Sequence, residues 1–123
     1  MRSHRMLQIF LLTALTAGVA FGQKKQLTFK SDVFPILKSY CLPCHSQENE
    51  NPSGLALDNY ELLMKGGNHE NTVVVGKPKE SNFYLKLLPN PSVGKQMPRN
   101  RKKLTEEEVK TIYDWIEQEA KKE

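Results

Sequence analysis

Two cysteines and a histidine form the most chemically distinctive segment of the chain. Cys41 and Cys44 are the only cysteines among the 123 residues, and His45 follows at once. Two thiols separated by two residues near a helix end can reach the two vinyl groups on one edge of a haem, and the next side chain then lies under the iron. The spacing predicts one covalent haem c on Cys41 and Cys44, with His45 as an axial ligand held by a carbonyl from residues 52–54.

Three other uses of these cysteines stay open. A thioredoxin-type dithiol is typical of a βαβ pattern, which this sequence lacks. A zinc site would have to recruit His69 or a carboxylate as a further ligand. A disulfide between Cys41 and Cys44 is compatible with an oxidising compartment, but it closes too short a loop to stabilise the fold much. Haem attachment is favoured over all three.

Met97, Met64 and His69 are the candidates for the second axial ligand. Met97 lies in a proline-bounded loop ahead of the last predicted helix, so the chain can fold over the distal face of the haem there. Met64 belongs to an apolar helical face and is expected to pack, whereas His69 lies in a Gly/Asn-rich loop and is expected to face solvent. We expect Met97 to bind the iron, and Met/His ligation raises the reduction potential of such a haem.

Apolar residues recur at helical spacing in the segments that must position these side chains. Ser31 is expected to be the N-cap of a helix that runs into Cys41. Asp58 is expected to cap a short helix that ends at Gly66. A third helix is expected from about 79 to 88.

The last predicted helix has the clearest local signal. Thr105 and Glu108 are spaced as a capping box, and an apolar stripe that includes Trp115 follows. This stripe can pack on the helix around Phe34. The sequence therefore predicts an all-α domain of three to four helices, whose long loops need something to pack against.

Residues 1–22 have the layout of a secretory signal peptide. Arg2 and Arg5 precede an apolar run over 7–21, and small residues surround a cleavage site after Gly22. The run is short of the roughly 20 residues that a membrane-spanning helix needs. We therefore expect cleavage, a periplasmic or otherwise exported protein, and no stable membrane insertion.

The length and composition limit what the remaining chain does. The 123 residues, 38% of them hydrophobic, leave room for one domain with a thin core that a bound group would help to stabilise. Residues 23–28 are expected to be a polar lead-in, 29–120 the domain and 121–123 a charged tail. Loss of the two signal-peptide arginines lowers the formal charge from +4 to +2, which argues against nucleic acid as a partner.

Taken together, these features resemble the small single-haem cytochromes c, most closely the planctomycete-type domain, across roughly 29–120. The matching residues are Val33-x-Pro35-Ile36-Leu37, Cys41-x-x-Cys44-His45, Gly54-Leu55-x-Leu57-Asp58, Leu63 with Gly66-Gly67, Val74-Val75-Gly76-Lys77-Pro78 with Ser81, Met97-Pro98, and Leu104-Thr105-x-Glu107-Glu108. The resemblance implies a cytochrome c fold around one covalent haem, with His45 and Met97 as axial ligands and electron transfer as the role. Arg99 is a departure, because family members often have a second proline there.

We expect a one-electron carrier that works by outer-sphere transfer and is not an enzyme. Two alternatives stay open: a haem protein with an open distal site for peroxide or gas, and a cytochrome subunit of a periplasmic dehydrogenase complex. A basic group surrounds Met97, made of Lys95, Arg99, Arg101, Lys102 and Lys103. It can steer an acidic redox partner, or Arg99 can pair with a haem propionate. Core packing is the expected role of Tyr60, Tyr84 and Trp115.

Overall fold

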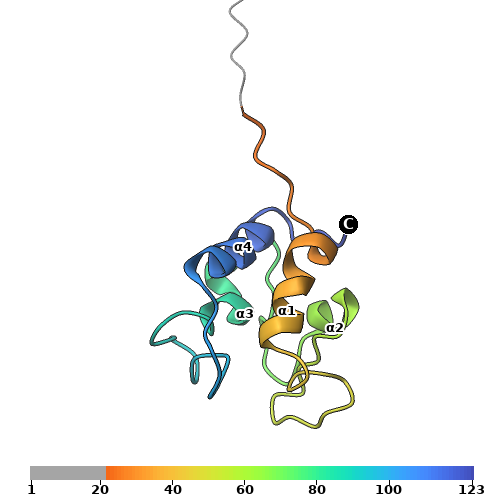
Figure 1. The fold of residues 1–123 in the computed structure, drawn as a ribbon, viewed down its shortest axis with the longest axis vertical. Coiled ribbons are helices and arrows are strands. Elements are labelled where there is room, and N and C mark those ends of the chain that lie inside the picture. The colour runs from red at the N-terminus through yellow and green to blue at the C-terminus, as the bar shows by residue number, and fades with distance from the viewer. Residues whose placement is uncertain (1–21) are drawn as a thin grey trace, which may run out of the picture.

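The structure, a computed structural model, describes residues 22–123 (Figure 1). Its elements, in chain order, are a π-helical turn η1 (Phe29–Val33), α1 (Phe34–Tyr40), α2 (Tyr60–Lys65), a 3₁₀ turn η2 (Pro78–Glu80), α3 (Asn82–Leu85) and α4 (Glu106–Glu117). This part of the chain contains no strand, so the expected all-α fold of helices and long loops is confirmed. The predicted signal peptide lies outside the described residues except for Gly22. Within 22–123, no helix is both long and apolar enough to cross a membrane.

The first helical segment begins earlier than its sequence pattern predicts. Thr28 is the N-cap, and its hydroxyl accepts a hydrogen bond from the Ser31 N–H at 3.2 Å. The Asp32 carboxylate in turn accepts the Thr28 N–H at 2.9 Å. The expected cap at Ser31 is therefore wrong, because this pair closes a wide π-helical turn that also buries Phe29. The segment then continues as α1 to the residue before Cys41, as predicted.

The second helix, α2, is short, as expected, but Asn59 caps it in place of Asp58. The Asn59 side chain accepts the Leu62 N–H at 2.9 Å. Asp58 instead accepts the Gln47 N–H at 2.6 Å, which fastens the loop that follows the cysteines. Gly66 ends the helix with a φ of 77°, a conformation that glycine adopts without steric cost.

The single helix expected over 79–88 is divided in two. An extended Ser81 separates η2 from α3. The Ser81 side chain is fully buried, and its hydroxyl accepts the Val74 N–H at 2.8 Å and lies 2.9 Å from the Lys77 carbonyl oxygen. These bonds reach back across the preceding loop, so they hold Ser81 in an extended conformation where the apolar pattern alone predicts helix.

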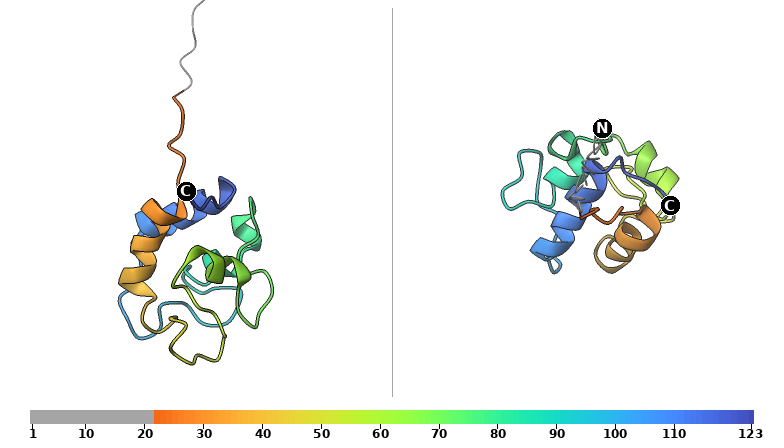
Figure 2. Two further views of the ribbon diagram at one scale, coloured as in Figure 1. Left: turned by 90° about the vertical axis from the view of Figure 1, so that its right-hand side faces the viewer. Right: turned by 90° about the horizontal axis from the view of Figure 1, so that it is seen from above.

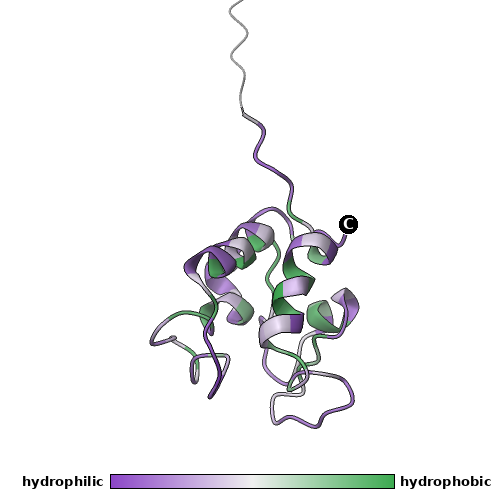
Figure 3. Ribbon diagram, in the orientation of Figure 1, coloured by the Kyte–Doolittle hydropathy of each residue, from purple (hydrophilic) through white to green (hydrophobic). Residues whose placement is uncertain are grey.

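The predicted capping box of α4 is confirmed. The Thr105 hydroxyl accepts the Glu108 N–H at 3.2 Å, and the Glu108 carboxylate accepts the Thr105 N–H at 2.8 Å. Trp115 is fully buried, and its ring lies 6.2 Å from the Phe29 ring, so α4 packs on η1. Figure 3 shows the apolar parts of α1, α2 and α4 turned toward the middle of the molecule.

Three aromatic residues have the core role that the sequence predicts for them. The Tyr60 hydroxyl donates to the Ala120 carbonyl oxygen at 3.0 Å, and the Trp115 indole N–H donates to the Lys121 carbonyl oxygen at 2.9 Å. Tyr84 packs edge to face on a tyrosine of α4, with ring centroids 5.2 Å apart. The bond from Trp115 also fixes the backbone of the first residue of the predicted tail.

Long loops form the end of the molecule that lies opposite the C-terminus. Figures 1 and 2 show the loop between α1 and α2, and the loop between α3 and α4, together at this end. The first loop carries the two cysteines and His45, and the second carries Met97. The fold therefore gathers at one end the residues whose chemistry the sequence singles out.

Candidate cofactor site

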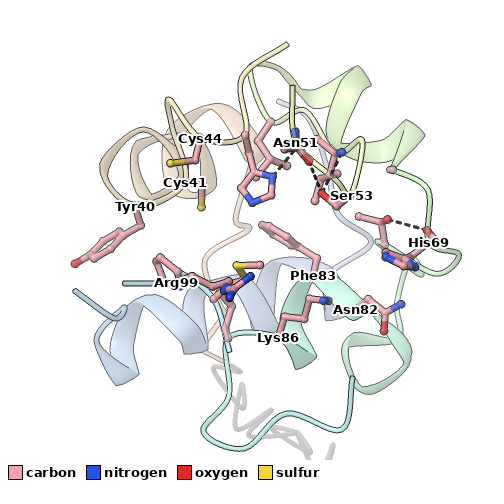
Figure 4. Close-up of a pocket in the computed structure, with 18 of the residues that line it drawn as sticks. Tyr40, Cys41, Cys44, Asn51, Ser53, His69, Asn82, Phe83, Lys86 and Arg99 are labelled. Atoms are coloured by element: carbon pink, nitrogen blue, oxygen red, sulfur yellow. Dashed lines mark hydrogen bonds between the residues drawn. The ribbon is translucent and has the colours of Figure 1, made fainter. Parts of the chain in front are cut away.

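One cavity of about 390 Å³ brings the predicted site residues together. Its walls include Cys41, Cys44, His45 and Met97, which come from two loops far apart in the sequence. The volume lies within the range of about 300–1,000 Å³ that small-molecule and cofactor sites occupy. Figure 4 shows the two cysteines on one side of this cavity.

The cysteine segment continues the coil of α1. The Cys41 N–H donates to the Leu37 carbonyl oxygen at 2.9 Å, and the His45 N–H donates to the Cys41 carbonyl oxygen at 3.0 Å. These bonds give residues 41–45 a turn-like course, so that both thiols and the imidazole border one space. Cys44 is exposed while Cys41 is half-buried, so the cysteine side of the cavity reaches the surface.

The Cys41 thiol lies in surroundings that disfavour its thiolate. Burial raises the pKa of the Cys41 thiol to about 11, although the nearby Arg101 guanidinium opposes this shift. Reactive cysteines of thioredoxin-type pairs have lowered pKa values and a high thiolate fraction at neutral pH. Both cysteines are free in the structure, and residues 22–123 contain no cluster of three or more potential metal-binding side chains. The raised pKa argues against Cys41 as the activated thiolate of a dithiol pair.

The imidazole of His45 is held in a fixed orientation. Its Nδ1 lies 3.0 Å from the Leu55 carbonyl oxygen, so Nδ1 carries the proton and donates it. The Leu57 N–H also donates to the His45 carbonyl oxygen at 2.7 Å, which fixes the backbone beside the ring. This arrangement leaves Nε2 as the ring atom with a free lone pair. The carbonyl comes from one residue beyond the 52–54 segment that we expected.

The three candidate distal ligands lie in different places. Met97 is half-buried and borders the cavity, and its N–H donates to the Lys86 carbonyl oxygen at 2.8 Å, which ties the loop to the end of α3. His69 also borders the cavity but is exposed, as predicted. Met64 packs against the apolar core instead, as expected. Met97 and His69, but not Met64, therefore lie beside the space that His45 borders.

The lining fits an apolar ring that carries negative charge. The apolar part of the wall is made by Leu55, Leu57, Phe83, Leu87 and Pro98. Lys86, Arg99 and Arg101 supply positive charge, whereas no aspartate or glutamate is among the lining residues. A haem has these properties, because its flat apolar body bears two carboxylates. The donors also suit it: two thiols for the vinyl groups, an oriented imidazole and a thioether for the iron.

Sequence reasoning missed the polar part of the wall. Asn51, Ser53, Thr72, Asn82 and Lys86 line the cavity together with the predicted residues. Most of them lie in loops, where no periodic pattern marks the side chains that face inward. The exception is the pair Asn82 and Lys86, whose spacing of four residues places both on one helical face.

The basic group predicted around Met97 is exposed, and part of it braces the loop. Among the ion pairs of residues 22–123, none includes Lys95, Arg99, Arg101, Lys102 or Lys103. Arg101 Nη1 donates to the Leu42 carbonyl oxygen at 3.2 Å, and the Lys103 ammonium donates to the Pro98 carbonyl oxygen. Two of these five cations therefore help to hold the loop beside the cysteines, and none forms an ion pair within residues 22–123.

A comparison with known families matches the segment that carries most of the cavity wall. Residues 41–99 match the family model described as Planctomycete cytochrome C. The matched segment begins at the first cysteine and includes His45 and Met97. No curated protein and no solved structure matches the chain.

Proposed function

Because the chain contains a planctomycete-type cytochrome c domain, we propose that it is an exported one-electron carrier with a single covalent haem c. In this proposal Cys41 and Cys44 form the thioether bonds, and His45 and Met97 are the axial ligands. The observation that carries the proposal is the shared cavity, whose wall holds both thiols, the oriented imidazole and the thioether. Domains of this kind are typically exported haem proteins that transfer electrons.

The residues around the cavity have separable tasks in electron transfer. When bound, the haem iron supplies a one-electron couple. The Leu55 carbonyl holds the His45 ring and makes it a stronger donor, whereas a Met97 thioether raises the potential. The buried Phe83 and Leu87 keep water from the interior side of the wall. Cys44 is exposed, so a haem attached there would have this edge near the surface, where a redox partner could approach it.

The basic group defined above is the proposed docking surface for an acidic redox partner. Arg99 and Arg101 line the cavity, so positive charge lies at its rim, and no carboxylate of residues 22–123 pairs with it. Such a charge raises the encounter rate with an acidic partner and acts over about 8 Å at physiological salt. The rate of electron transfer to an acidic protein should therefore fall as salt is added.

Visible spectra of the holoprotein, expressed in a periplasm with haem-attachment machinery, test this function. We expect the sharp reduced bands of a low-spin c haem and, in the oxidised form, the weak far-red band of methionine ligation. Replacing Cys41 and Cys44 by alanine should abolish covalent haem. Met97→Ala should remove the far-red band, whereas Met64→Ala is the matched control and should keep it. A high-spin wild-type protein that binds carbon monoxide would instead support an open distal site.

Export has its own test. We propose that the signal peptide 1–22 is removed, so that N-terminal sequencing of protein from the periplasmic fraction should begin at Gln23. Protein that retains residues 1–22 and stays with the membrane fraction would contradict cleavage. That result would leave the haem proposal intact.

A further inference from the structure

We propose that Lys86, His69 and Asn82 form the binding site for the two haem propionates. This inference rests on the proposed function, since it takes the thioether bonds at Cys41 and Cys44 as its starting point. None of the three residues stands out in the sequence as a propionate partner. The chemical class that they recognise is a pair of carboxylates on the edge of a flat apolar ring.

The position of the cysteines decides where the propionates lie. The vinyl groups and the propionates are on opposite edges of a haem, so a ring bonded to both cysteines directs its carboxylates across the cavity. Figure 4 shows Cys41 and Cys44 on one side of the cavity and Ser53, His69 and Asn82 on the other. The second group therefore borders the space into which the propionates would extend.

Two backbone hydrogen bonds hold the His69 loop against the start of α3. The Asn82 N–H donates to the Asn71 carbonyl oxygen at 2.7 Å, and the Phe83 N–H donates to the Thr72 carbonyl oxygen at 2.9 Å. Within α3 and its last turn, the Lys86 N–H donates to the Asn82 carbonyl oxygen at 3.1 Å. His69, Asn82 and Lys86 thus form part of one braced unit at the polar end of the cavity.

The polar side chains of the cavity wall differ in the hydrogen-bond donors that they have left for a ligand. The Ser53 hydroxyl already donates to the Asn51 side-chain oxygen at 2.5 Å, and the Asn51 amide donates to the Leu55 carbonyl oxygen at 3.2 Å. The Asn82 amide gives one of its two hydrogens to the Glu70 carbonyl oxygen at 2.8 Å and keeps the other. The Ser53 hydroxyl is therefore committed to the loop, whereas Asn82 and Asn51 each keep one amide hydrogen. Of these two amides, only Asn82 lies on the same helical face as Lys86.

Charge favours Lys86 as the main partner of a carboxylate. Its side chain is half-buried at the cavity wall, and among residues 22–123 no carboxylate forms an ion pair with its ammonium. Arg101 is the less suitable cation, because its guanidinium donates to the carbonyls of Tyr40 and Leu42 beside the cysteines. Arg99 also lines the cavity and is the competing partner that an experiment must separate from Lys86.

Proton NMR of the reduced, diamagnetic holoprotein tests the assignment without any measurement of activity. We expect nuclear Overhauser contacts from the propionate methylene protons to the ε-methylene of Lys86 and to the His69 ring. Lys86→Gln should remove the first contact and lower the reduction potential, because a cation close to the propionates offsets their negative charge and so favours the reduced haem. The matched control is Lys79→Gln, which removes an exposed lysine that neither lines the cavity nor belongs to the basic group, and it should leave the potential unchanged.

The outcomes separate this inference from the proposed function. Propionate contacts to Arg99, together with a potential that falls in Arg99→Gln but not in Lys86→Gln, would overturn the inference and leave haem attachment standing. Equal potentials in Lys86→Gln and the wild type would also overturn it. A wild-type protein without covalent haem would refute the proposed function itself, and this inference with it.

Discussion

Replacement of Ser81 by alanine is expected to destabilise the fold although it leaves every proposed haem contact in place. The Ser81 side chain is fully buried, and its hydroxyl is the acceptor for the Val74 N–H at 2.8 Å. The same hydroxyl lies 2.9 Å from the Lys77 carbonyl oxygen and 3.3 Å from that of Val74. One side chain therefore ties the loop that follows α2 to the start of α3.

The magnitude follows from the groups that alanine would leave unpaired. A buried donor or acceptor without a partner costs about 1–3 kcal/mol, and the half-buried Val74 N–H would lose its acceptor. Loss of the hydroxyl hydrogen adds a smaller cost in stability, since that hydrogen can be donated to only one carbonyl oxygen at a time. We expect Ser81→Ala to lower the free energy of unfolding by about 2 kcal/mol. For a domain of this size, that change lowers Tm by about 10 °C.

Thermal unfolding of the holoprotein, followed by far-UV circular dichroism, measures this change. Ser39→Ala is the matched control, because the exposed Ser39 hydroxyl donates to the Pro35 carbonyl oxygen within α1 at 3.0 Å. Ser39→Ala should change the free energy of unfolding by no more than about 0.5 kcal/mol. If the two variants melt at the same temperature, the Ser81 hydroxyl does not hold the loop and the reasoning is refuted. The visible spectrum should be unchanged in both variants.

Three further changes probe the loops and the helix ends. Gly67→Ala would place a Cβ 2.3 Å from the Ser53 carbonyl oxygen, so we expect a loss of about 1–3 kcal/mol in urea unfolding; a loss below 0.5 kcal/mol would contradict this close approach. Thr105→Ala removes the N-cap of α4 and should cost about 1 kcal/mol in the same assay, whereas an unchanged midpoint would count against the capping box. The hydrogen bond from Lys25 lowers the pKa of the Asp32 carboxyl. The ionised carboxylate therefore stabilises the fold above about pH 4, and this stabilisation is lost as the pH falls through the lowered pKa of Asp32. The free energies of unfolding of the wild type and Asp32→Asn, measured in urea, should therefore differ at pH 6 and converge near pH 2. A difference that does not depend on pH would refute this role of Asp32.

The part of the site that neighbouring residues form was predictable from the sequence. The cysteines and His45 lie within five positions, so their joint use follows from spacing alone, and the matched family supports it. Met97 was predicted as the distal ligand from its loop, and the structure brings it to the same cavity; its bond to iron stays a prediction. Lys86 and His69 could not be assigned to the propionate end, because that requires knowing how the loop after α2 packs on α3.

In the fold, too, local patterns were predictable from the sequence, whereas contacts between distant segments were not. The α4 capping box was predicted correctly, since its two hydrogen bonds join residues three positions apart and depend on nothing beyond the helix. The third helix was predicted as one piece, because only the packed structure places the Val74 N–H against Ser81. Local sequence therefore determined the cysteine segment, the histidine and the last helix. The tertiary structure decided the break of the third helix at Ser81 and the polar wall of the cavity, because those depend on hydrogen bonds between segments that meet only when the chain folds.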